Sequence, residues 1–112
     1  MVTKLSMEEA RKRMAAHPGW QLWGSAIARS YWFPTFAKTM EFVNRVARFA
    51  EETGHHPDIS ISYTRVTLTL STLSVAGLTE QDFELAAKIE AEAGPAGAKA
   101  EARPEAEAAK KA

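Results

Sequence analysis

The chain has 112 residues, of which 46% are hydrophobic, which is enough for one domain with one modest core. Fourteen basic and fourteen acidic side chains give a formal net charge of zero, so no broad positive field is available to attract nucleic acid or an anionic membrane. The chain has no cysteine, which excludes disulfides, thiolate nucleophiles and cysteine-based zinc sites. No apolar run reaches the roughly 18 residues of a membrane span, and no signal segment opens the chain. We therefore expect a cytoplasmic protein that binds neither nucleic acid nor membrane.

A short helix is predicted over residues 6–16. Ser6 and Glu9 have the spacing of a capping box, in which each side chain accepts a hydrogen bond from the backbone amide of the other residue. Pro18-Gly19 follows and should end the helix, because proline cannot continue it.

Residues 20–33 are predicted to form a β-hairpin, since two β-rich runs with alternating side chains flank Gly24-Ser25. Residues 35–52 then return to helical periodicity. The apolar side chains of this helix cover an arc of roughly 180°, which is wider than the ~100° stripe that packs against one sheet face. The extra width predicts a second apolar partner, which we expect to be another copy of the chain.

A second hairpin is predicted from residues 59–63 and 66–73, which alternate strictly between apolar and polar side chains on the two sides of a short turn. This pattern continues the second strand to Leu73 and places that residue at the end of an otherwise polar row. The other members of the row are Thr67, Thr69 and Ser71.

The last helix is predicted to start at Thr79 and to end at Ala93, before a Gly-Pro pair. Thr79 and Asp82 have capping-box spacing, and the apolar residues on either side of them have the spacing of a hydrophobic staple. In residues 94–112 no apolar side chain other than proline is larger than alanine, so this segment is interpreted as a disordered or partly helical tail. Residues 1–93 then form the single domain.

The predicted element order is α-β-β-α-β-β-α. Such an order indicates an α+β domain in which three helices cover one face of a four-stranded antiparallel sheet. The other sheet face and the outer strand edges then need a cover, which again favours a homo-oligomer.

Two histidines stand side by side in the sequence "GHHPD" at residues 54–58. Gly54 suits the left-handed cap at the end of the preceding helix, and Pro57 prevents its continuation. His55 and His56 could then be helix-end residues that bind the last carbonyl groups, or general acid and base groups that titrate near neutral pH. A metal-binding role would need about three or four ligands, and no recognisable ligand set accompanies the pair, so we expect no metal site.

A longer pattern becomes specific at this point, namely Glu51-x3-His55-His56-Pro57-x5-Tyr63. It continues in the stretches "RVTLTLST" and "GLTEQD". The likeness also includes "PGW" and the longer stretch "FVNRVARFAEETGHHPD", which contains the two histidines. Over about residues 5–92 the chain thereby resembles the pterin-4a-carbinolamine dehydratase family.

The resemblance implies an α+β fold whose subunits pair through their sheets into dimers and tetramers. It also implies an enzyme that eliminates water from 4a-hydroxytetrahydrobiopterin to give quinonoid dihydrobiopterin, without metal or cofactor. The other role known in the family is that of a dimerisation cofactor for transcription factors, which implies a protein partner.

The resemblance also implies site residues. His55 and His56 are the expected general acid and base, although their order is left open. The expected substrate-binding residues are Glu51, Pro57, Asp58, Ser71, Thr72, Leu73 and Asp82. Local pattern alone gives Glu51 and Asp82 sufficient structural roles, on a charged helix face and at a helix cap.

One of these positions departs from the family pattern, because Leu73 stands where the family has a third histidine or a tryptophan. Leucine can neither transfer a proton nor form a hydrogen bond with a pterin. Two hypotheses follow from this departure. The protein is either an attenuated dehydratase or a catalytically degenerate relative that acts as a dimerisation cofactor, a binding factor or an assembly factor, as in RuBisCO assembly.

Overall fold

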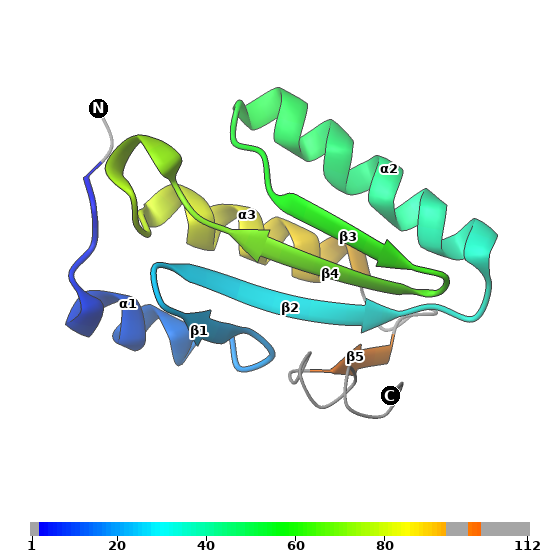
Figure 1. Ribbon diagram of the computed structural model, residues 1–112, viewed down its shortest axis with the longest axis horizontal. Coiled ribbons are helices and arrows are strands. Elements are labelled where there is room, and N and C mark those ends of the chain that lie inside the picture. Colours follow the sequence, from blue (N-terminus) through cyan, green and yellow to red (C-terminus); the bar gives the residue numbers. More distant parts are fainter. Residues whose placement is uncertain (1–2, 94–98, 102–112) are drawn as a thin grey trace.

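The computed structural model describes residues 3–93 and 99–101 of the chain. Figure 1 shows a sheet with helices packed against it. The elements in chain order are α1 (Met7–Met14), β1 (Gln21–Trp23), β2 (Ala26–Trp32), α2 (Phe36–Thr53), β3 (Asp58–Ser62), β4 (Arg65–Leu70), the 3₁₀ turn η1 (Leu73–Val75), α3 (Glu80–Ala93) and β5 (Lys99–Glu101). Among the described helices, none has the combination of length and apolar character that crossing a bilayer requires.

The main sheet is antiparallel with the strand order β1-β2-β4-β3. This arrangement and the three helices confirm the predicted α+β class. The short strand β5 pairs with Ser30–Trp32 of β2, beyond the part of β2 that pairs with β1. The prediction for residues 94–112 otherwise falls outside the described residues, and β5 is a strand that the sequence pattern did not predict.

The core lies between the sheet and the helices. The register pairs Ile27 with Leu70 and Tyr31 with Val66, so these four side chains point to the same sheet face, and all four are buried. Figure 1 shows α2 and α3 on one side of the strands. The ring of Tyr31 packs against Phe42 of α2, with ring centroids 5.3 Å apart, which ties that helix to the central strand.

Helix α1 is joined to α3 by two polar contacts. Arg13 pairs with Glu80, and His17, just after α1, pairs with Glu90 through Nδ1 and Oε2, 2.8 Å apart. These contacts hold α1 beside α3.

The predicted helix ends are confirmed for α1 and α2. The capping box of α1 forms, with Ser6 N donating to Glu9 Oε1 at 3.0 Å and Glu9 N donating to Ser6 Oγ at 3.1 Å. Helix α2 ends at Gly54, whose φ of 70° lies in the left-handed region that favours glycine.

The predicted extension of the second hairpin to Leu73 is wrong, because β4 ends at Leu70. Strand β3 starts at Asp58, opposite Thr69, so beyond this point β4 has no neighbour on that side to continue the ladder. The chain instead closes a loop in which Thr72 N donates to Gly77 O at 2.8 Å. Leu73 therefore does not end a polar row of the sheet but lies on η1, with 90% of its surface exposed.

Candidate active site

The two histidines lie where three elements meet: the end of α2, the loop after β4 and the start of α3. Gly54 turns the chain away from α2, and the next two residues are presented to the loop after β4. The three elements line a shallow depression of about 290 Å³. Its lining consists of Gly54, His55, His56, Ser71, Thr72, Leu73, Ser74 and Gln81.

His55 is paired with a buried carboxylate. Its Nε2 lies 2.6 Å from Oδ1 of Asp82, and the side chains are 11% and 0% exposed, respectively. The other carboxylate oxygen, Oδ2, accepts hydrogen bonds from Thr72 Oγ1 at 2.8 Å and from Thr79 N at 2.9 Å. Asp82 therefore caps α3 with one oxygen and holds His55 with the other.

The hydroxyl groups of Thr72 and Thr79 form a hydrogen-bonded series that ends at the Asp82 carboxylate. Thr72 Oγ1 and Thr79 Oγ1 are 2.9 Å apart, and Thr79 Oγ1 also accepts from Gln81 N at 3.2 Å. Because each hydroxyl has a single hydrogen and that of Thr72 goes to Asp82, the hydrogen of Thr79 must go to Thr72. All three side chains are buried, so the position of Asp82 is fixed.

The pair also selects the tautomer of the imidazole. An ionised carboxylate only accepts hydrogen bonds, so Nε2 of His55 carries the hydrogen and Nδ1 is the acceptor of the neutral ring. Nδ1 can take up a proton, and the buried carboxylate of Asp82 stabilises the resulting imidazolium. This arrangement is suited to a general base.

His56 has a second carboxylate partner, but in an exposed setting. Its Nε2 lies 2.8 Å from Oε2 of Glu51, and both side chains are exposed. Exposed pairs of this kind add little to stability, whereas contact with water lets the imidazole exchange its proton with solvent. Among the described residues, no group of three or more histidine, aspartate and glutamate side chains is arranged to hold a metal ion.

The predicted site residues thus divide into three groups. Both histidines, Ser71, Thr72 and Leu73 line the depression. Glu51 and Asp82 stand behind the histidines as their partners, and Thr72 directs its hydroxyl hydrogen to Asp82. Pro57 and Asp58 are not among the lining residues, and Asp58 instead opens β3 opposite Thr69.

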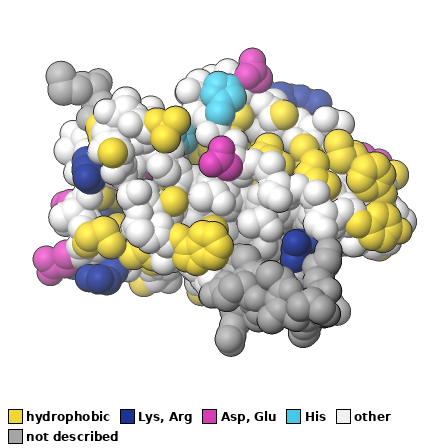
Figure 2. Space-filling view, in the orientation of Figure 1, with side chains coloured by type: hydrophobic (Ala, Val, Ile, Leu, Met, Phe, Trp, Pro, Cys, Tyr) yellow, Lys and Arg dark blue, Asp and Glu magenta, His cyan; other side chains and the backbone are white. Residues whose placement is uncertain are grey.

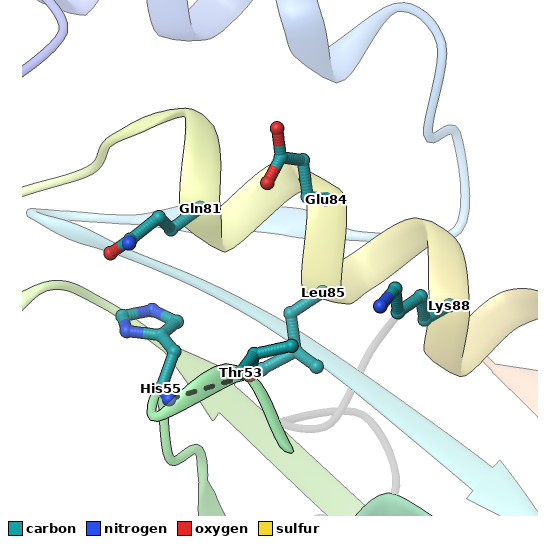
Figure 3. A pocket seen from close by; sticks show the side chains of 6 residues that line it. All are labelled: Thr53, His55, Gln81, Glu84, Leu85 and Lys88. Carbon is teal, nitrogen blue, oxygen red and sulfur yellow. Dashed lines mark hydrogen bonds between the residues drawn. The ribbon is translucent and has the colours of Figure 1, made fainter. Parts of the chain in front are cut away.

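Sequence reasoning missed several residues of this region, including Thr79, Ser74 and Gln81. The capping-box spacing singled out Thr79, but only as a helix cap. The sequence also did not predict a second cavity of about 140 Å³ that His55 lines as well (Figure 3). This second cavity is lined by Thr53, His55, Gln81, Glu84, Leu85 and Lys88.

The family model described as pterin 4 alpha carbinolamine dehydratase matches residues 3–92. The chain belongs to this family.

Relatives in the family extend over most of the chain. A protein of Thermomicrobium roseum is 53% identical over 72 residues, which is 64% of this chain and 77% of the relative. A protein of Acidobacterium capsulatum is 47% identical over 90 residues, which is 80% of this chain and 98% of the relative. Both are provisionally named pterin-4-alpha-carbinolamine dehydratases.

Two solved structures carry different functional descriptions. The transcriptional coactivator/pterin dehydratase of Brucella melitensis superposes with a TM-score of 0.79 and 37% identity, over 82% of this chain and all of that one. A pterin dehydratase-like protein, described as a RuBisCO assembly factor in the alpha-carboxysome, has a TM-score of 0.57 and 30% identity, over 67% of this chain and 87% of that one. Family membership therefore does not by itself decide between catalysis and assembly.

Proposed function

We propose that this protein is a 4a-hydroxytetrahydrobiopterin dehydratase that uses His55 and His56 as its general base and general acid. The observation that carries the proposal is the 2.6 Å contact between His55 Nε2 and Oδ1 of the fully buried Asp82. His55 and His56 both line the depression. A buried carboxylate held by two further hydrogen-bonding partners would be costly to keep for a histidine that only ends a helix.

The reaction removes a hydroxide from C4a and a proton from N5 of the pterin. In the proposed mechanism Nδ1 of His55 accepts the N5 proton, and the electron pair of the N–H bond forms the N5=C4a double bond. The C4a–O bond breaks at the same time, and the departing hydroxide takes a proton from His56 to leave as water. His56 donates one proton and His55 accepts one, so proton exchange with solvent returns both histidines to their starting protonation states.

Proton transfer by positioned side chains contributes about 10²–10⁴-fold to a rate, which two histidines can share. Leu73, at the mouth of the depression, supplies an apolar wall and no third proton-transfer group. The proposed enzyme is therefore slower than one in which a polar side chain stands at this position.

A second candidate function is that of a non-catalytic assembly or dimerisation factor. It is favoured by Leu73, because an apolar side chain that is 90% exposed beside the depression is suited to contact with a protein partner. The likeness to the RuBisCO assembly factor also supports this alternative.

Stopped-flow loss of the absorbance of 4a-hydroxytetrahydrobiopterin separates the two functions. We expect the wild type to exceed the buffer reaction, His55→Ala and His56→Ala to lose most of this rate, and Leu73→His to gain rate. His17→Ala is the matched control, because His17 also pairs with a carboxylate but lies outside the depression. A wild-type rate equal to the buffer reaction would exclude the enzyme and leave the assembly role.

A further inference from the structure

The outer edge of strand β2 is covered in two parts. On one side, β2 pairs with β4 from Ile27 to Trp32. On the other side, β1 pairs with Ala26–Ala28, because β1 has three residues and β2 has seven. The rest of this side, Ser30–Trp32, is paired with β5 (Figure 1). Among the described strands, β5 is therefore what satisfies the backbone groups of Ser30–Trp32 that point away from β4.

Without β5, this part of β2 would be a place where a second copy of the chain can pair. Ser30–Trp32 contains two aromatic residues, a type that is enriched in strands, and bare strand edges pair readily with other chains. Antiparallel pairing of the segment with its counterpart in a second copy would place Tyr31 opposite Tyr31, about a twofold axis. Such pairing would use the same three residues that pair with β5, so the two contacts exclude each other.

The strand that covers this edge belongs to a part of the chain outside the match to the family model, which ends at residue 92. In the sequence, alanine and charged residues alternate from Ala98 to Arg103. Charged residues on an edge strand oppose pairing with a further sheet. A segment of this composition can therefore cover the edge of β2 without offering a new edge that attracts another copy.

We propose that Lys99–Glu101 is an intramolecular cap, which prevents a second copy of the chain from pairing with β2 at Ser30–Trp32. The two competing contacts each pair three residues and differ mainly in concentration. Five residues, 94–98, connect α3 to β5, and a segment on so short a linker has an effective concentration on the order of millimolar. A second copy at micromolar concentration is about 10³-fold more dilute. The chain's own strand therefore occupies the edge, and association of copies is left to other surfaces.

Ala100→Pro tests the cap in the full chain. Proline has no amide hydrogen and fixes φ at about −65°, so it opposes pairing in the middle of β5. At low protein concentration, hydrogen exchange measured by mass spectrometry should be about tenfold faster in Ser30–Trp32 than in the wild type, the effect of roughly one lost hydrogen bond. Exchange in Arg65–Leu70 of β4 should stay at its wild-type rate, which shows that the sheet is intact. Ala108→Pro, the same substitution beyond β5, is the control and should exchange like the wild type.

Raising the protein concentration then shows what the cap prevents. Light scattering should give a larger mass for Ala100→Pro than for the wild type, and Ser30–Trp32 should regain slow exchange as copies pair there. Unchanged exchange of this segment in Ala100→Pro at low concentration would overturn the cap. Faster exchange with no increase in mass, or an increase in mass without renewed protection of Ser30–Trp32, would overturn its role against pairing. None of these measurements uses pterin turnover, so their outcome is independent of the dehydratase proposal.

Discussion

Asp82 shows how a single side chain can serve both the fold and the site. Its oxygen Oδ2 accepts hydrogen bonds from the backbone N of Thr79, just before α3, and from Thr72 Oγ1. The other oxygen, Oδ1, is hydrogen-bonded to His55 Nε2. The capping role follows from the three-residue spacing to Thr79. The contact with His55 spans 27 positions of the chain, and no local pattern reports it.

Replacement of Asp82 by asparagine should separate these two roles. The amide oxygen can still accept from Thr79 N and Thr72, but its NH₂ group then faces His55 and favours the tautomer with the proton on Nδ1. Since Nδ1 is the proposed base, we expect kcat to fall by about 10²–10⁴-fold in the stopped-flow assay. Glu90→Gln alters the matching pair with His17 and should leave kcat unchanged. Wild-type kcat in Asp82→Asn would refute this positioning role.

At the scale of elements, the end of α2 determines where the histidines lie. Gly54 has a φ of 70°, and a Cβ added there would meet no atom within 4 Å, so a side chain would cost only backbone conformational energy. Gly24, in the turn between β1 and β2, has a φ of 55° and the same open surroundings. The two glycines form a matched pair, one beside the site and one distant from it.

Gly54→Ala and Gly24→Ala should each lower the free energy of unfolding by about 1–2 kcal/mol, the cost of a left-handed L-residue. Urea denaturation measures this change. Only Gly54→Ala should also reduce kcat, because relief of the strain would move His55 and His56 out of position. Equal effects of the two substitutions on kcat would show that the cap does not position the site.

The packing of α1 on α3 is sensitive to pH through Glu80. The hydrogen bond from Arg13 holds the pKa of Glu80 below its ordinary value of 4.5. A carboxyl group with a lowered pKa stabilises the fold above its unfolded pKa, and this stabilisation is lost as the pH falls through the folded pKa. The side chains of Arg13 and Glu80 are 35% and 54% exposed, so solvent screens the pair and its contribution is small.

We therefore expect Glu80→Gln to have a lower urea midpoint than the wild type at neutral pH, and the difference to disappear as the pH falls through the folded pKa of Glu80. Glu41→Gln, in an exposed position of α2, serves as the control. A difference between Glu80→Gln and the wild type that stayed constant down to acidic pH would show that the charge of Glu80 contributes nothing.

At the scale of the whole molecule, apolar side chains gather at the end where α2 begins and the turn between β3 and β4 lies (Figure 2). Phe36 and Tyr63 are 50% and 72% exposed, and their rings stack with centroids 6.3 Å apart. Ile61 of β3 is exposed close by in the sequence. Among the described strands, β3 lies at the edge of the sheet and pairs only with β4.

These features support the prediction of a homo-oligomer, dimer or tetramer. Light scattering at micromolar concentration should give at least twice the mass of one chain. Ile61→Lys should lower this mass, because a lysine on an edge strand opposes pairing with another sheet. Ala16→Lys, at an exposed position outside the sheet, is the control. A monomeric wild type would contradict the prediction.

Features that depend on local interactions could be predicted from the amino-acid sequence. The Ser6–Glu9 capping box, the left-handed end of α2 at Gly54 and the alternation in β4 each depend on residues a few positions apart. From these features the element order follows, and with it the α+β class. The adjacent histidines were also visible as a candidate site, together with the departure at Leu73.

How these segments pack against one another could be seen only in the folded protein. It ended β4 at Leu70, because strand length depends on neighbouring strands and not on alternation alone. It joined His55 to Asp82, and it formed the second cavity between the end of α2 and α3. Such contacts connect residues far apart in the chain, where periodicity and spacing carry no information about distance.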